Sequence, residues 1–304
     1  MNRPDKKTLL EYEVFYKPDT DFASQARLLQ SKWRVRKGFK INDTPKSNYG
    51  NFIDTKIAKD EKVNFLTNNI KKLVSEKILE IRRNGGLVGE PRIWNNLLSS
   101  QPLCFNLFGE LHYDLDLATR LFKKQFPDKV TSVTKIDFEF SSKRNNPDNS
   151  AFDVYVEYLN KHKKCFFGIE VKYQEDLYEE TSVKAAEIFQ IHKDDYIKVT
   201  DDSRCFKPNA IDKLQLVPLS QIWRDHLLSF NMTDENNSGS FIFLYPFEND
   251  ECREGVTAYQ KLLVSGNEEE TKFYPRDLAK FIRTLNAIHN TDWTRELIER
   301  YLGE

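Results

Sequence analysis

The chain has 304 residues, of which 39% are hydrophobic, 13% aromatic and 31% charged, and its formal net charge is −1. This length and composition can bury a sizeable core in one large or two small domains, which excludes disorder throughout the chain. A net charge this close to zero also excludes an overall positive field for nucleic acid, so a surface that binds it must be a local patch.

Membrane insertion and structural metal binding are not favoured. No apolar run approaches the roughly 18–20 residues that cross a bilayer, and the first residues lack the apolar stretch of a signal peptide, so we expect a cytoplasmic protein. The five histidines form no HExxH or HxH arrangement, which does not favour a zinc site. Four widely spaced cysteines without a CxxC pair predict buried thiols: Cys104, Cys165, Cys205 and Cys252.

The first 50 residues predict an irregular arm with one helix, at about Asp21–Arg36. Between Ala23 and Lys40 the chain carries basic residues and no acidic ones, with Trp33 and Phe39 among them. Such a stretch can hold a phosphate backbone, or it can be a solvated helix face anchored by aromatic rings. The six basic residues are Arg27, Lys32, Arg34, Arg36, Lys37 and Lys40.

Two strong helices follow, at about Asp60–Arg83 and Phe105–Phe126. The first has apolar residues at three- and four-residue spacing, and Gly85-Gly86 after it suits a left-handed C-cap. Between them, Pro91 is expected to open a short helix through Trp94, Leu97 and Leu98.

Alternating or continuous apolar residues predict strands after residue 130. The expected order of helix, three strands, helix and strand predicts a mixed α/β domain with helical additions at both ends. We expect an N-terminal helical extension over residues 1–98 and the main domain over 99–304. The expected elements are strands at Ile136–Phe140, Ala151–Leu159, Cys165–Tyr173 and Ser240–Phe247, a loop at 193–212, and helices at Glu175–His192, Ser220–Ser229, Glu251–Val264, Pro275–Ile288 and Asp292–Leu302.

The second and third strands meet across a short polar turn. If Asn160–Lys163 form a four-residue loop, Leu159 pairs with Lys164 and Asp153 lies opposite Glu170. A slip of one residue would mix apolar and charged side chains on each face, whereas a slip of two would preserve the faces. One face then carries Val154, Val156, Tyr158, Phe167, Ile169 and Val171, and the other carries Asp153, Tyr155, Glu157, Gly168, Glu170 and Lys172.

The second face allows two interpretations. Lys172 lies two residues after Glu170, so both side chains project from the same side of the strand. The three charged residues can be an ion-pair cluster on a solvated sheet face. Alternatively, Asp153 and Glu170 hold a divalent cation, since hard carboxylate oxygens suit Mg²⁺ or Mn²⁺.

The pattern of Asp153, a turn, and then Glu170-Val171-Lys172 resembles the motif of the PD-(D/E)XK nucleases, the restriction-endonuclease-like superfamily. The likeness covers roughly Phe105–Tyr173, with Ser240–Phe247 as a fourth core strand. Further stretches resemble a family of largely uncharacterised bacterial proteins described as restriction endonucleases. These stretches are Ile93-Trp94-Asn95-Asn96, Ser99–Leu111, Ser150-Ala151-Phe152-Asp153 and Ile169–Tyr173.

The resemblance implies that Asp153 and Glu170 bind Mg²⁺ or Mn²⁺ and that Lys172 orients water or stabilises charge at the phosphate. It also implies a further acid on the preceding helix, for which Glu110 is the candidate ligand; a favourable charge in the first helical turns is the alternative.

Weaker candidates surround this motif. Pro147-Asp148 supplies a literal Pro-Asp pair, but it falls in the preceding loop, so Asp148 ranks below Asp153. Glu139 and Gln174 are candidates for contact with the motif residues, and Tyr155 is better explained by packing.

The resemblance therefore implies a Mg²⁺-dependent endonuclease that hydrolyses phosphodiester bonds, with DNA favoured over RNA as substrate. The alternatives are a protein of this fold that binds nucleic acid or a partner without cleaving, and a small-molecule enzyme, for which no glycine-rich phosphate loop is found. A homodimer would suit cleavage of both strands.

Overall fold

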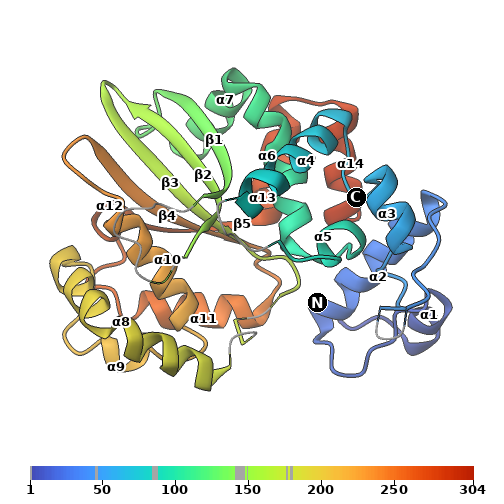
Figure 1. Cartoon of the computed structure of the whole chain (residues 1–304), viewed down its shortest axis with the longest axis horizontal. Coiled ribbons are helices and arrows are strands. Elements are labelled where there is room, and N and C mark those ends of the chain that lie inside the picture. The colour runs from blue at the N-terminus through green and yellow to red at the C-terminus, as the bar shows by residue number, and fades with distance from the viewer. Residues whose placement is uncertain are drawn as a thin grey trace. The chain divides into compact units, whose positions relative to one another are not determined.

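The computed structural model describes residues 2–44, 47–83, 88–140, 148, 150–175, 177–178 and 181–304. Contacts divide the chain into two compact units (Figure 1). Unit 1 comprises Met1–Asp114, Tyr173–Glu175 and Leu278–Glu304, and unit 2 comprises Leu115–Lys172 and Asp176–Asp277. The expected boundary after residue 98 stays a prediction.

Within these described ranges, no helix is both long and apolar enough to cross a membrane. All four cysteines lie among the described residues, and they are buried thiols that form no disulfide, as predicted.

Unit 1 is helical. The hydroxyl of Thr20 accepts a hydrogen bond from the backbone N–H of Ala23 at 3.1 Å, which caps the predicted helix at Asp21–Arg36. The helices of this unit are α1 (Lys6–Glu11), α2 (Asp21–Arg36), α3 (Thr55–Glu61), α4 (Asn68–Arg83), α5 (Arg92–Asn95), α6 (Ser100–Tyr113), α13 (Leu278–Ile288) and α14 (Asp292–Tyr301).

Both long helices predicted as continuous are broken. Lys62 adopts a left-handed conformation (φ 53°) that ends α3, so helix resumes only with α4. Asp114 (φ −119°, ψ 84°) leaves the helical region after α6, and α7 (Leu115–Gln125) begins immediately beyond it. The predicted cap at Gly85-Gly86 lies outside the described residues.

Unit 2 is built on a mixed sheet. Among the residues that the structure describes, five strands form the sheet in the order β1-β2-β3-β4-β5. The first three are antiparallel neighbours, whereas β3–β4 and β4–β5 are parallel. The strands and remaining helices are β1 (Ser132–Phe140), β2 (Phe152–Asn160), β3 (Lys163–Val171), α8 (Ser182–Ser203), α9 (Ile211–Leu214), α10 (Ser220–Asn231), β4 (Asn237–Tyr245), α11 (Asp250–Gln260), α12 (Glu268–Thr271) and β5 (Phe273–Asp277).

The mixed α/β class and its order of helix, three strands, helix and strand are confirmed, with two corrections. Residues 193–203 continue α8 through a kink at His192 (φ −114°, ψ 18°) and do not form the expected loop. Pro275 lies in β5 and does not begin a helix; β5 is an edge strand, where a residue without an N–H is tolerated.

The predicted register of β2 and β3 is confirmed. Leu159 pairs with Lys164, and the ladder continues to Val154 opposite Ile169. The turn is shorter than expected, because Asn160 also pairs with Lys163 and leaves only Lys161-His162 between the strands. Lys161 takes the positive φ (56°) that such a tight hairpin turn requires.

Helices pack on both faces of the sheet (Figure 1). On one face, the ring of Phe167 on β3 stacks on Phe126, which follows α7, at 4.5 Å between centroids. On the other face, Phe166 and Tyr155 belong to an apolar cluster that includes side chains of α8, α10 and α11. The charged positions of β2 and β3 lie on this second face.

Deep in that cluster, the imidazole of His226 on α10 is fully buried, and its Nδ1 lies 2.9 Å from the hydroxyl of Tyr259. Burial lowers the pKa of His226 to about 3, from an ordinary 6.5. The unfolded chain therefore binds a proton below pH 6.5 that the folded protein does not bind.

We expect the free energy of unfolding to fall as the pH is lowered below 6.5, by up to about 1.4 kcal/mol per pH unit from this residue. The measurement is urea unfolding at several pH values for the wild type and His226→Gln. Carboxylates contribute equally to the pH dependence of both proteins. The difference between the two slopes of unfolding free energy against pH therefore reports His226 alone. Equal slopes would contradict the prediction.

Candidate functional site

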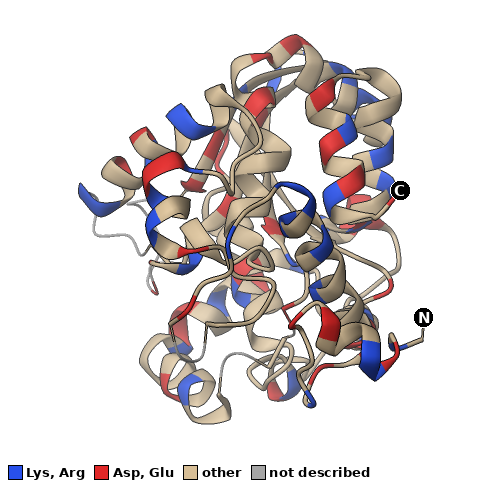
Figure 2. Cartoon of the chain, turned by 90° about the vertical axis from the view of Figure 1, so that its right-hand side faces the viewer, with Lys and Arg blue, Asp and Glu red and all other residues tan. Residues whose placement is uncertain are grey.

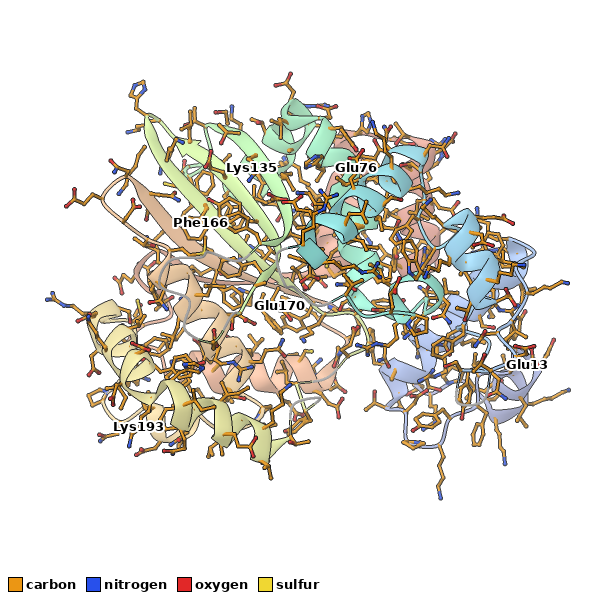
Figure 3. The ribbon with its side chains drawn as sticks, in the orientation of Figure 1. Glu13, Glu76, Lys135, Phe166, Glu170 and Lys193 are labelled. Carbon is orange, nitrogen blue, oxygen red and sulfur yellow. The ribbon has the colours of Figure 1, made fainter. Side chains whose placement is uncertain are left out.

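The ends of β2 and β3 bring Asp153 and Glu170 together. One step beyond the Val154–Ile169 pair, the register places Asp153 opposite Glu170, as predicted. The carboxylate of Asp153 accepts a hydrogen bond through Oδ2 from the backbone N–H of Val171 at 2.8 Å. Figure 3 labels Glu170 near the C-terminal end of β3, with Phe166 further back along the strand.

Lys172 joins this pair, just past the end of β3. Its Nζ lies 3.1 Å from Oε1 of Glu170, and both residues are buried, with relative exposures of 6% for Lys172 and 7% for Glu170. Its backbone N–H donates to the carbonyl of Leu244 on β4 at 2.9 Å, which holds the residue against the sheet. The interpretation as a solvated ion-pair cluster is therefore wrong about solvation, because the charges lie under α10.

Gln221 on α10 connects the lysine and the glutamate. Its Nε2 donates to Oε1 of Glu170 at 2.8 Å, and its Oε1 accepts from Nζ of Lys172 at 3.0 Å. The amide thus bridges both charged groups and orients each of them. No pattern in the sequence marked Gln221, although the helix that carries it was predicted, because 51 residues separate it from Glu170.

The electrostatics of the site favour a bound cation. Burial, followed by the nearby carboxylates of Glu170 and Glu139, raises the pKa of Asp153 well above its ordinary value. Among the described residues, Oδ1 of Asp153 and Oε2 of Glu170 accept no hydrogen bond. Two carboxylate oxygens on facing strands fit Mg²⁺ or Mn²⁺, which completes its shell with water and phosphate.

The described part of the chain contains no group of three or more Asp, Glu, His or Cys side chains that converge as metal ligands. A cation at this site would therefore use Asp153 and Glu170 as its protein ligands there, with further acids acting at longer range.

Glu110, the third predicted ligand, lies on α6 in unit 1. Its Oε2 accepts a hydrogen bond from Nδ2 of Asn69 at 3.1 Å, and its Oε1 accepts one from the hydroxyl of Thr67. These bonds connect α6 to the start of α4. A metal-binding role for Glu110 stays a prediction.

The weaker candidates have different surroundings. Asp148 accepts hydrogen bonds from the hydroxyl of Tyr196 at 2.6 Å and the N–H of Ser150 at 3.0 Å, which indicates a structural carboxylate. Tyr155 stacks on Phe140 at 4.3 Å between centroids, so packing accounts for it.

The other two weaker candidates are Glu139 and Gln174. Glu139, near the end of β1, has a positive φ of 47° and lies close enough to Asp153 to raise its pKa. Gln174 belongs to unit 1. Pro147, the other half of the literal Pro-Asp pair, lies outside the described residues.

Most basic residues of the stretch between Ala23 and Lys40 form ion pairs or hydrogen bonds within unit 1. Arg27 pairs with Asp19 (Nε–Oδ2, 2.7 Å), and Nε of Arg34 donates to the carbonyl of Gly50 at 2.8 Å. Figure 2 shows Lys and Arg interspersed with Asp and Glu along the helices. These contacts favour the structural interpretation of the stretch. The remaining ion pairs join Arg36 to Glu299 and Lys37 to Glu296.

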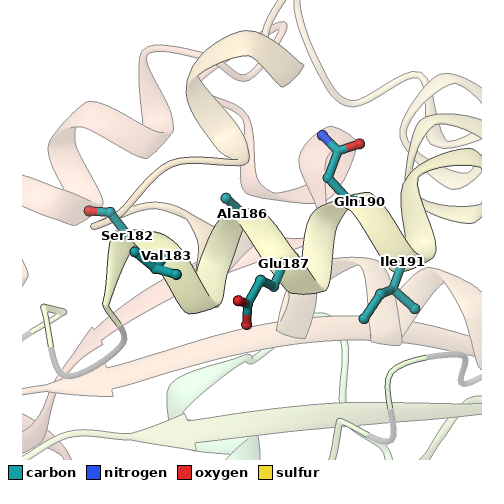
Figure 4. Close-up of a pocket in the computed structure, with 6 residues that line it drawn as sticks. All are labelled: Ser182, Val183, Ala186, Glu187, Gln190 and Ile191. Atoms are coloured by element: carbon teal, nitrogen blue, oxygen red, sulfur yellow. The ribbon is translucent and has the colours of Figure 1, made fainter.

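A surface hollow of about 740 Å³ lies along α8 (Figure 4). Its lining is almost entirely apolar and contains none of the candidate catalytic residues, so its chemistry does not suit phosphodiester hydrolysis. The lining residues are Ser182, Val183, Ala186, Glu187, Gln190 and Ile191.

Comparison with known proteins provides the family. A family model described as the PD-(D/E)XK nuclease superfamily matches residues 17–303, nearly the whole chain. Comparison with curated proteins and with solved structures found no match. The helix-flanked mixed sheet is consistent with a restriction-endonuclease-like fold. The chain therefore belongs to the PD-(D/E)XK nuclease superfamily.

Proposed function

We propose that this protein is a Mg²⁺- or Mn²⁺-dependent endonuclease that hydrolyses phosphodiester bonds in DNA. Membership in a nuclease superfamily supports the general activity. The observation that carries the specific proposal is the buried arrangement of Glu170 and Lys172, 3.1 Å apart, with Asp153 opposite Glu170 on the neighbouring strand.

In the proposed mechanism, Asp153 and Glu170 hold the divalent cation through their oxygens that accept no hydrogen bond. When bound, the cation lowers the pKa of water and neutralises the scissile phosphate. Lys172 stabilises the charge that develops on the phosphate, and it does so from a fixed position because Glu170 and Gln221 hold its ammonium. Gln221 also occupies Oε1 of Glu170, which leaves Oε2 as the oxygen that would hold the cation.

DNA is the proposed substrate because the restriction-endonuclease likeness favours it, and RNA is the alternative that shares the phosphate chemistry. We propose a cytoplasmic location and a homodimer as the form that cleaves both strands. The alternative function is a nuclease-fold protein that binds nucleic acid or a partner without turnover. The complete set of Asp153, Glu170 and Lys172 favours catalysis.

We expect the wild type to nick supercoiled plasmid DNA only with Mg²⁺ or Mn²⁺ present. Asp153→Asn and Lys172→Ala should each slow nicking about 100-fold or more, because each removes a charge that stabilises the transition state. The measurement is the initial rate of conversion to open-circle plasmid.

Lys164→Ala is the matched control for this assay. Lys164 lies on β3, the strand that leads to Lys172, but its side chain is 61% exposed. This variant should cleave like the wild type. Nicking that survives in both site variants would contradict the assignment. A wild type without DNA cleavage would be tested on RNA, and failure there too would favour a binding-only role.

Gln221→Leu should lower kcat about 10-fold or more with little change in KM. The substitution keeps the side-chain size but removes two hydrogen bonds to charged groups, which are worth about 1.5–3 kcal/mol each. Gln260→Leu, at an exposed position of α11, provides the control. An unchanged kcat would show that Gln221 does not position Lys172 and Glu170.

Glu110→Gln should raise the Mg²⁺ concentration needed for half-maximal cleavage, if Glu110 contributes to the cation site as predicted. Cleavage rates across a Mg²⁺ titration test this, with Glu76→Gln on the exposed side of α4 as the control. A lower melting temperature with an unchanged Mg²⁺ dependence would instead assign Glu110 to anchoring Thr67 and Asn69.

A further inference from the structure

Asp225 on α10 is a buried carboxylate that the fold leaves unsatisfied. The residue is 6% exposed, and among the described residues its Oδ2 has no hydrogen-bond partner. Buried charged groups in proteins are normally paired or bind metal ions, so an orphaned carboxylate oxygen needs an explanation.

The position of Asp225 connects it to the candidate site. It follows Gln221 by four residues, so both side chains lie on the same face of α10 one turn apart. Gln221 contacts Glu170 and Lys172 directly. In agreement with this placement, burial and then the charge of Glu170 raise the pKa of Asp225, whereas Arg224 and Lys172 lower it.

The nearby Asp148, in the same unit, is a carboxylate with structural partners. It has hydrogen bonds from Tyr196 and Ser150, and its Oδ2 lies 3.6 Å from Nε of Arg224. Arg224 therefore approaches Asp148, whereas no residue in the described part of the chain forms a comparable ion pair with its neighbour Asp225.

We propose that Asp225 is a positioning residue of the cation site and that its Oδ2 accepts a hydrogen bond from a water molecule bound to the divalent cation. This inference rests on the proposed function. A water-mediated role suits Mg²⁺, which usually keeps several waters. It also agrees with the absence of three converging metal ligands among the described residues.

The test is Mn²⁺ binding by the full chain without nucleic acid, measured by titration with electron paramagnetic resonance of free Mn²⁺. The wild type should bind Mn²⁺, and Asp153→Asn should lose this binding. Asp225→Asn should weaken it about 10-fold or more, as expected for a residue that orients the shell around a metal. Asp148→Asn removes a paired carboxylate and should bind Mn²⁺ like the wild type.

Thermal unfolding distinguishes this role from simple packing. Without metal, Asp225→Asn should melt at or above the temperature of the wild type, because it removes a buried charge that Glu170 repels. Added Mn²⁺ should raise the melting temperature of the wild type more than that of the variant. A packing role would instead lower the melting temperature and leave Mn²⁺ affinity unchanged.

The outcomes separate the two proposals. Wild-type Mn²⁺ affinity in Asp225→Asn, together with loss in Asp153→Asn, would overturn the role of Asp225 and leave the nuclease site intact. No Mn²⁺ binding by the wild type, or unchanged binding by Asp153→Asn, would overturn both. Asp225→Ser provides a second replacement if the asparagine variant does not fold.

Discussion

Leu159 pairs with Lys164 and Val154 with Ile169 across β2 and β3, and the geometry of the candidate site depends on this register. Because side chains alternate along a strand, a slip of one residue would place Asp153 and Glu170 on opposite faces of the sheet. Packing on the site face restricts the register as well. A Cβ on Gly168 would lie 2.3 Å from the ring of Phe152, so only glycine leaves room for that ring.

This arrangement places charged side chains in the protein interior, where their desolvation is unfavourable. Glu170, Lys172 and Asp225 are each at most 7% exposed. Lys172 and Gln221 contact Glu170, and the charges of Arg224 and Lys172 act on Asp225. Well-packed apolar side chains in place of a buried ion pair are often neutral or stabilising. Stability alone therefore does not account for these residues, which agrees with the proposed cation site.

Local signals predicted the parts of this fold that depend on neighbouring residues. The helix expected at about Asp21–Arg36 matches α2, and the alternation of apolar residues predicted the register of β2 and β3. The predictions failed where tertiary contacts decide the structure. Lys62 ends α3 in a left-handed conformation that residues other than glycine rarely adopt, and Pro275 joins β5 through parallel pairing with Phe243 on β4.

The candidate site shows the same division. The spacing of Glu170 and Lys172 predicted two charges on one side of a strand, because that relation is local. Gln221 reaches Glu170 and Lys172 only because α10 packs on β3 and β4, and no spacing in the sequence indicates that contact.

The basic residues of α2 show why a run of like charges does not by itself predict a phosphate-binding surface. Lys37 pairs with Glu296 at 2.8 Å, across 259 positions of sequence, and Arg27 pairs with Asp19. Each pair holds a basic side chain against the folded chain of unit 1, so that this side chain is less available to a ligand. The proposed attraction for a scissile phosphate therefore rests on the divalent cation that Asp153 and Glu170 would hold and on the ammonium of Lys172 beside it.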